Sequence, residues 1–278
     1  MDCKVDYINF SIPTRVPFEA GNPDNEQNAH VILKDFLGDC YAPIFGGHVW
    51  EFNESKGFYH TRYFDADTKI SIFVGTVNKH IHLEVGGQAL DFIRAFGCYE
   101  NFMQKVASRT SRVDFAVDFE TEDSVSSFID NNYKGRFKAG GHIFSEDGET
   151  RYVGSWKGER FARIYRYHKP HPRSNKLRAE VVLRGDYAKQ GMAIWVQEGE
   201  VAATLAAHKP FEWVSPLWQP SVATKSTIKS HRADKERAST VRWIYGEVFA
   251  CISKCHREGL IDIHDFVKKL LKDAQYYD

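Results

Sequence analysis

The segment from residue 148 to residue 190 carries the side chains best suited to chemistry on a polyanion. It contains eleven lysine or arginine residues, with four tyrosines, two histidines and one tryptophan among them. Such a mixture is typical of nucleic-acid binding, because cations pair with phosphates and rings stack on bases. A charged face that is merely solvated is the simpler alternative. The candidate DNA contacts are Arg151, Tyr152, Trp156, Lys157, Arg160 and Lys169.

A tyrosine and an arginine inside this segment are spaced to act together. Residues 161–167 (FARIYRY) predict a β-strand, because aromatic and β-branched residues are dense and no apolar stripe of helical period can be drawn. Alternation along a strand places Arg163 and Tyr165 on the same face. A guanidinium and a phenol in this relation can act on one phosphate, with Tyr152 and Tyr167 as substitutes for the phenol.

Carboxylates occur on two neighbouring predicted strands. Asp114 and Asp118 share one face of RVDFAVDF, and Glu180 lies on KLRAEVVLRG. Two residues four apart on a strand are about 13 Å apart, so one of the aspartates with Glu180, rather than both aspartates, could bind one metal ion. Oxygen ligands favour Mg²⁺ or Mn²⁺. Ion pairs with Arg112 and Arg178 are the alternative for these acids.

A second candidate metal site lies earlier in the chain. His80 and His82 flank one apolar residue, so a strand would place both imidazoles on one side. An ordinary surface strand gives the same pattern, and the pair lies outside the basic, tyrosine-rich segment.

The elements that must position these residues occur twice in the same order. Each half begins with a strand and a helix, continues with a group of short strands, and ends with a strand that carries a glutamate (Glu84 or Glu180) and leads into a helix. The expected strands are 4–12, 47–53, 58–64, 69–75, 80–85, 111–119, 141–146, 150–156, 161–167 and 176–185. The expected helices are 26–37, 88–96, 123–131 and 186–207, followed by helical patterns in the last 40 residues.

This order predicts an α+β fold: an internally duplicated unit with curved, mainly antiparallel β-sheets flanked by helices, plus a C-terminal helical segment. We expect a first, non-catalytic repeat at 1–104, a second, catalytic repeat at 105–220, and a basic linker with C-terminal helices at 221–278.

Charge is divided unevenly along the chain although the total is zero. Residues 1–130 carry 11 basic and 20 acidic side chains, a net charge of −9, whereas residues 131–278 carry 26 and 17, a net charge of +9. The basic half is therefore the expected DNA-binding half. No apolar run approaches the roughly 20 residues of a membrane span, and the N-terminus has no signal pattern, so we expect a soluble, cytoplasmic protein.

Several pieces in order resemble the replication initiation factor family (Rep_trans type), the rolling-circle initiators of small plasmids and filamentous phages. They are RVDFAVDF, then GETRYVGSWKGERF, then RIY followed by Lys169, then RAEVVLRGDYA. The resemblance covers about residues 110–190 closely and the opening strand more loosely.

The resemblance implies a DNA endonuclease and strand transferase that nicks one strand at an origin and stays attached to the 5′ phosphate. Tyr165 would be the nucleophile and Arg163 would hold the scissile phosphate. Asp114, Asp118 and Glu180 would be the ligands of the divalent metal. The expected partner is origin DNA in single-stranded, cruciform or supercoiled form, and a homodimer and a host replication helicase are further candidate partners.

Trp156 and Gly158 depart from the family pattern, in which basic or small polar residues are more common, and this leaves the DNA contacts there open. Two other functions fit the same residues. One is a regulator that binds DNA with this fold but has lost catalysis, and the other is a conjugative relaxase, which needs the same chemistry.

Overall fold

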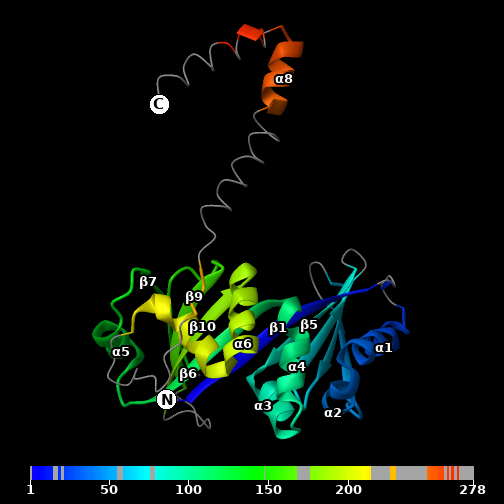
Figure 1. Ribbon diagram of the computed structural model, residues 1–278, viewed down its shortest axis with the longest axis vertical. Coiled ribbons are helices and arrows are strands. Elements are labelled where there is room, and N and C mark those ends of the chain that lie inside the picture. The colour runs from blue at the N-terminus through cyan, green and yellow to red at the C-terminus, as the bar shows by residue number, and fades with distance from the viewer. Residues whose placement is uncertain are drawn as a thin grey trace. The chain divides into compact units, whose positions relative to one another are not determined.

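Alternating apolar side chains give the strands of this protein one face that packs against helices. The computed structural model describes residues 2–14, 18–19, 22–54, 59–75, 79–146, 148–167, 176–213, 226–229 and 249–259, with positions 262, 264, 265 and 268. The chain divides into two compact units, residues 1–228 and 229–278. The first unit contains a ten-stranded antiparallel sheet with helices against it (Figure 1). The second unit contains helix α8 (Phe249–Arg257).

The strands lie close to the predicted positions. They are β1 (Asp2–Pro13), β2 (Trp50–Glu54), β3 (Thr61–Asp65), β4 (Ile70–Val74), β5 (His80–Gly86), β6 (Thr110–Glu120), β7 (Ala139–Ser145), β8 (Gly148–Val153), β9 (Arg160–Tyr167) and β10 (Lys176–Arg184). The strand expected at 150–156 ends earlier, at Val153, because the chain turns at Gly154, whose φ of 89° is in the left-handed region that favours glycine.

The helices of the first unit include two that the sequence analysis did not predict, α2 and α4. The helices are α1 (Asn25–Leu37), α2 (Tyr41–Phe45), α3 (Gly87–Ala95), α4 (Tyr99–Val106), α5 (Val125–Asn132) and α6 (Asp186–His208). Short 3-10 turns occupy Gly38–Cys40, Ala107–Arg109 and Lys209–Phe211. Within the described residues, no helix combines the length and apolar character needed to cross a membrane.

The strand order confirms the predicted α+β class and shows the duplication directly. The sheet runs β2-β3-β4-β5-β1-β6-β10-β9-β8-β7. The first strands of the two halves, β1 and β6, pair at the centre. Outward from β1 the order is β5, β4, β3 and β2, and outward from β6 it is β10, β9, β8 and β7, so the two halves have the same arrangement. The two halves share one continuous sheet rather than forming two. The boundaries expected at residues 104 and 220 stay a prediction.

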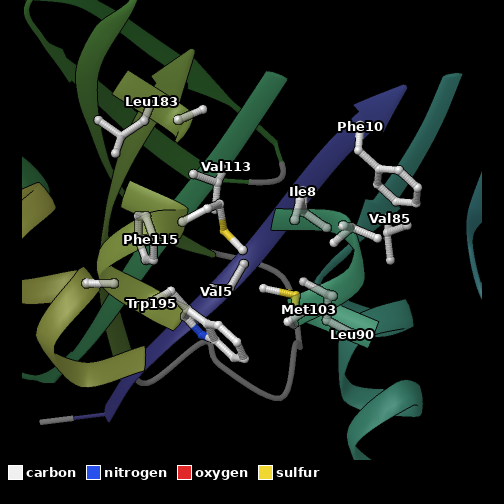
Figure 2. Close-up of a cluster of buried hydrophobic side chains, with 14 of the residues drawn as sticks. Val5, Ile8, Phe10, Val85, Leu90, Met103, Val113, Phe115, Leu183 and Trp195 are labelled. Carbon is white, nitrogen blue, oxygen red and sulfur yellow. The ribbon is translucent and has the colours of Figure 1, made fainter. Parts of the chain in front are cut away.

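The hydrophobic core lies on the helix side of the sheet and extends under both halves. Figure 2 shows Val5 of β1 between residues of the first half, such as Met103, and residues of the second, such as Phe115 and Trp195. Burying these side chains removes apolar surface from water, and each full burial contributes about 1.5–3 kcal/mol. The core therefore joins the two repeats into one unit.

Helix α6 approaches the sheet very closely at one glycine. A Cβ at Gly191 would lie 2.9 Å from Leu183 Cδ1 and 2.9 Å from Phe115 Cε2. Only a glycine allows this contact without displacing those side chains. The close approach holds α6 against β6 and β10, the strands that carry the candidate active-site acids.

The opposite side of the sheet, which we call the polar face, carries the charged residues of the same strands. On β6, β9 and β10 this face includes Arg112, Asp114, Asp118, Arg163, Tyr165, Arg178 and Glu180, whereas the residues that alternate with them along β6 and β10 are mostly apolar and buried in the core. The alternation predicted for these three strands is therefore present.

Candidate active site

Three neighbouring strands bring the candidate catalytic side chains together. In the antiparallel register, Glu180 of β10 lies opposite Arg163 of β9, and Arg178 lies opposite Tyr165. On the other edge of β10, Val182 lies opposite Asp114 of β6. Directly opposed residues on one face have Cβ atoms about 4.5–5.5 Å apart, so their side chains touch.

Glu180 binds both the tyrosine and the arginine. The Tyr165 hydroxyl donates a hydrogen bond to Glu180 Oε1, and Arg163 Nε donates to Glu180 Oε2 at 2.5 Å. Glu180 is fully buried. One carboxylate thus orients a phenol with one oxygen and a guanidinium with the other.

Arg163 is held on its second side by Asp114. Its Nη2 donates to Asp114 Oδ2 at 3.3 Å, while Arg112 donates to both oxygens of Asp114 at 2.9 and 2.7 Å. Asp114 is fully buried, but the Arg163 side chain remains 32% exposed. Arg163 is therefore fixed in direction and still accessible to a phosphate.

A second buried ion cluster lies beside the first. Arg178 donates to both oxygens of Asp118 at 2.6 Å each, and its Nη1 lies 2.6 Å from Asp6 Oδ1. The ion pairs expected of Arg112 and Arg178 are thus present. Asp6 was not among the predicted residues, and the signal for it was the repetition of the RVDF motif as KVDY at the start of the chain.

Burial and neighbouring charge shift the acid–base properties of the site. Burial, together with the Asp6 and Asp114 carboxylates, raises the pKa of Glu180 to about 7, although Arg163 opposes the shift. Burial and then the Glu180 carboxylate raise the pKa of Tyr165 above its ordinary value. Glu180 and Asp114 raise the pKa of Arg163 despite its burial. The phenol is therefore protonated at rest, and its hydrogen-bond acceptor can take up a proton near neutral pH.

The side chains of the cluster have a negative formal charge in total, which a bound divalent cation and a phosphate could balance. Four carboxylates face three guanidinium groups, a formal charge of −1, which a divalent cation and one phosphodiester would bring to zero. The oxygen donors suit Mg²⁺ or Mn²⁺ in type. The carboxylates are Asp6, Asp114, Asp118 and Glu180, and the guanidinium groups belong to Arg112, Arg163 and Arg178.

The predicted ligands do not form a ready-made metal cage. Among the described residues, the three side chains whose ligand atoms lie within 4.8 Å of one another are His48, Asp65 and Asp67, not Asp114, Asp118 and Glu180. His48 Nδ1 lies 3.2 Å from Asp65 Oδ2. The spacing of residues 48, 65 and 67 matches no metal-binding pattern, so this group could not be predicted from the sequence.

Asp65 already has a structural role in the turn between β3 and β4. Its carboxylate accepts the backbone N–H of Asp67 at 3.3 Å, the backbone N–H of Thr68 at 3.1 Å, and the Thr68 hydroxyl. Five strands separate β3 from β9 in the sheet order. This group is therefore remote from Tyr165, and turn formation accounts for it.

The histidine pair of β5 is also occupied by local contacts. His82 Nδ1 hydrogen-bonds the Ser11 hydroxyl at 2.9 Å, and the His82 ring stacks on Tyr59 at 5.5 Å. His80 is exposed and is the first residue of β5. Neither belongs to the ligand group found among the described residues.

Two of the predicted DNA contacts project from the turn between β8 and β9. Trp156 is 60% exposed, and Lys157 Nζ lies 5.4 Å from its ring centroid. Arg184 fixes the turn, because its Nη1 donates to the Trp156 carbonyl at 3.0 Å and the Gly158 carbonyl at 3.3 Å. The turn therefore presents a flat ring beside a cation, which is suited to base stacking.

The other predicted contacts divide between the two faces. Tyr152 pairs with Arg163 in the register, on the polar face. Arg151 instead turns towards α5 and donates to Ser126 Oγ at 2.9 Å, and Arg160 lies 4.9 Å from the ring of Tyr187 at the start of α6. Lys169 lies outside the described residues.

The first repeat has the same framework without the reactive side chains. Glu84 of β5 pairs with Ser71 of β4, as Glu180 pairs with Arg163. Phe73 then stands where β9 has Tyr165. The first repeat thus keeps the glutamate but has a serine and a phenylalanine in place of the arginine and the tyrosine.

A scan against models of known protein families finds no match, and a search of curated proteins finds none either. Among solved structures, the chain is similar to that of a rolling circle replication initiator protein from Geobacillus stearothermophilus, with a TM-score of 0.52. The two chains are 17% identical, and the match covers 76% of this chain and 86% of that chain. The likeness establishes a shared fold across most of both chains.

Proposed function

We propose that this protein is a rolling-circle DNA replication initiator that nicks and rejoins one DNA strand through Tyr165. The observation that carries the proposal is the contact of one buried glutamate with both the Tyr165 phenol and the Arg163 guanidinium. The fold shared with a rolling circle initiator and the family motifs along β6, β9 and β10 support it. The serine and the phenylalanine at the equivalent positions of the first repeat support catalysis by the second repeat.

In the proposed reaction, the Tyr165 phenolic oxygen attacks the phosphorus of the scissile phosphodiester while its proton passes to Glu180. The bond between phosphorus and the 3′ oxygen breaks, and the leaving 3′ oxygen takes a proton to become a hydroxyl. The product is a 5′-phosphotyrosine link. Because this link replaces one phosphoester by another, attack of a 3′ hydroxyl can reverse it without ATP.

Arg163 would stabilise the negative charge that develops on the phosphate oxygens. Its exposed side chain is anchored by Glu180 and Asp114, so little reorientation is needed when DNA binds. Asp114 in turn is oriented by Arg112. The arginine therefore acts as a preorganised phosphate clamp.

Asp114 and Glu180 would hold the divalent Mg²⁺ or Mn²⁺ ion. Such an ion, when bound, neutralises charge on the phosphate and favours the phenolate. Both oxygens of Asp114, of Asp118 and of Glu180 already accept hydrogen bonds, so an ion would have to displace some of these partners, among them the two hydrogen bonds from Arg178 to Asp118.

The proposed partner is origin DNA, contacted by Tyr152, Trp156 and Lys157 near the site and by Lys169. A homodimer, a host replication helicase and a cytoplasmic place of action belong to the same proposal. A non-catalytic DNA-binding regulator is the second candidate, favoured by the arginines that already pair with Asp114, Asp118 and Glu180. A conjugative relaxase would use the same chemistry.

Replacing the nucleophile tests the proposal. With Mn²⁺ and a supercoiled plasmid that carries the cognate origin, the wild-type protein should give nicked circles with covalently attached protein, and EDTA should prevent this. Tyr165→Phe should form no adduct, because the attacking oxygen is gone, while Tyr152→Phe should still form one. If Tyr165→Phe forms as much adduct as the wild type, Tyr165 is not the nucleophile. If the wild type forms no adduct, the non-catalytic DNA-binding regulator is the better candidate.

A further inference from the structure

A row of rings and one arginine crosses the polar face of the first repeat. Arg62 Cζ of β3 lies 4.6 Å from the ring centroid of Phe64 and 5.8 Å from that of Phe73. Phe73 lies 5.9 Å from His82, on which Tyr59 stacks. All five side chains are half-buried, so each keeps part of its surface in solvent. We call this group the Arg62 row.

The cation of this row is not neutralised by an acid in the described part of the chain. Arg62 donates with Nε and Nη2 to Ser71 Oγ at 3.1 and 2.9 Å, and among the described residues no carboxylate forms an ion pair with it. Lys69 Nζ lies 5.6 Å from the Phe64 ring. In the candidate active site, by contrast, Arg112, Arg163 and Arg178 each have a carboxylate partner. A planar cation between aromatic rings is suited to phosphates and bases of a flexible strand.

We propose that the Arg62 row is a second binding site for single-stranded DNA, which holds the strand nicked at Tyr165 without cutting it. The proposal rests on the proposed function. The row occupies the position equivalent to the active site, with Phe73 in place of Tyr165 and Ser71 in place of Arg163. Phe73 has no hydroxyl, so the position equivalent to Tyr165 presents a ring for stacking and no nucleophile. Aromatic stacking beside a cation that has no carboxylate partner among the described residues favours single-stranded DNA over a protein partner.

The distance between the two sites sets the length of strand that can occupy both. From β4 to β9 the sheet order passes through β5, β1, β6 and β10, which makes five strand spacings. At about 4.8 Å per spacing the span is roughly 24 Å, or about seven nucleotides at 3.4 Å each in a stacked strand. A pentanucleotide at the active site should not reach the row, whereas a 15-mer should.

The experiment measures binding in a protein that cannot cleave. Fluorescence anisotropy of labelled oligonucleotides, 5 and 15 nucleotides long and containing the nick sequence, is compared in the Tyr165→Phe background with and without Arg62→Ala. The added substitution should weaken binding of the 15-mer by roughly 5- to 100-fold, as loss of one base contact does, and should leave the 5-mer unchanged. The slope of log affinity against log salt should fall in magnitude by about 0.7, the value for one phosphate of a single strand.

Two further variants make the outcome decisive. Phe73→Leu keeps apolar volume but removes the ring, so it should weaken only the 15-mer. Lys34→Ala removes an exposed cation from helix α1, on the other side of the sheet, and should change neither affinity. The proposal would be overturned if the Tyr165→Phe parent and the variants with Arg62→Ala or Phe73→Leu added bound the 15-mer with equal affinity. That is the result expected if the row binds a protein partner instead of DNA. The two proposals fail in different measurements. Absence of a covalent adduct with the wild type would reject the nicking function, whereas the effect of Arg62→Ala on 15-mer binding tests the Arg62 row and does not depend on cleavage.

Discussion

A tyrosine is a poor nucleophile unless something accepts its proton, and in the proposed reaction Glu180, which contacts the Tyr165 hydroxyl directly, would accept it. A phenol ordinarily has a pKa near 10, and burial in this site raises the pKa of Tyr165 further. The Glu180 carboxylate accepts the hydrogen bond from this phenol and has a pKa near 7. Proton transfer can therefore accompany attack on the phosphate instead of preceding it.

Removing this proton acceptor should slow nicking strongly. Glu180→Gln keeps the size of the side chain but cannot take up the phenol proton, so we expect a decrease in the single-turnover nicking rate of about 10²- to 10⁴-fold. Glu84→Gln is the matched control, because Glu84 occupies the same register position in the first repeat, and it should nick at nearly the wild-type rate. Equal effects of the two substitutions would mean that Glu180 has no special role in the reaction.

Residue alternation was sufficient to place most of this site in advance. Strand periodicity, which is independent of the rest of the fold, predicts that Arg163 and Tyr165 share a face, whereas their contact with Glu180 depends on the pairing of β9 with β10. Asp6 was missed, since its position depends on a register shift between Val5 and Tyr7 and on the pairing of β1 with β6. A local pattern cannot report which distant strand becomes a neighbour.

Helix α6 is tied to the central strand β6 by a buried histidine. His208 Nε2 hydrogen-bonds the Phe115 carbonyl at 3.0 Å, and Trp213 Nε1 donates to His208 Nδ1 at 3.2 Å. Nδ1 must therefore be an acceptor, which requires the neutral ring. Burial lowers the pKa of His208 to about 4, although the hydrogen bond to the carbonyl opposes the shift.

This histidine should make stability depend on pH. The folded pKa lies below the unfolded value of 6.5, so the unfolded chain binds a proton first as pH falls. The contribution of His208 to the free energy of unfolding is complete above pH 6.5. As the pH falls from 6.5 to 4, the protein loses about 3 kcal/mol of this stability. Urea unfolding at several pH values should show a smaller loss over this range for His208→Gln than for the wild type. A variant with the wild-type pH dependence would contradict this account of His208.

The longer elements were predictable and the short ones were not. β6, β9, β10 and α6 have sustained periodicity, whereas α2 has only five residues and depends on packing against its neighbours. Such short helices are stabilised by tertiary contacts more than by their own sequence. The order of the strands could not be predicted either, because pairing between distant strands leaves no local mark.

At the scale of the molecule, the duplication is consistent with the proposed division of roles between a catalytic second repeat and a non-catalytic first repeat. The two repeats share one sheet and one core, so the fold of the first repeat stabilises the strands of the second repeat, which carry the candidate active site. In the proposed division of roles, the first repeat takes no part in catalysis and its face holds the strand through Arg62. The predicted duplication is present in the sheet order.

Direct mapping of the covalent link tests the central claim. The wild-type protein is incubated with Mn²⁺ and a single-stranded oligonucleotide that contains its nick site, then digested with trypsin and nuclease and analysed by mass spectrometry. Cleavage after Arg163 and Arg166 releases Ile164, Tyr165 and Arg166 as one peptide, so Tyr165 separates from Tyr152 and Tyr167. We predict that the 5′ phosphonucleotide is on this peptide, and its presence on a peptide carrying another tyrosine would contradict the assignment.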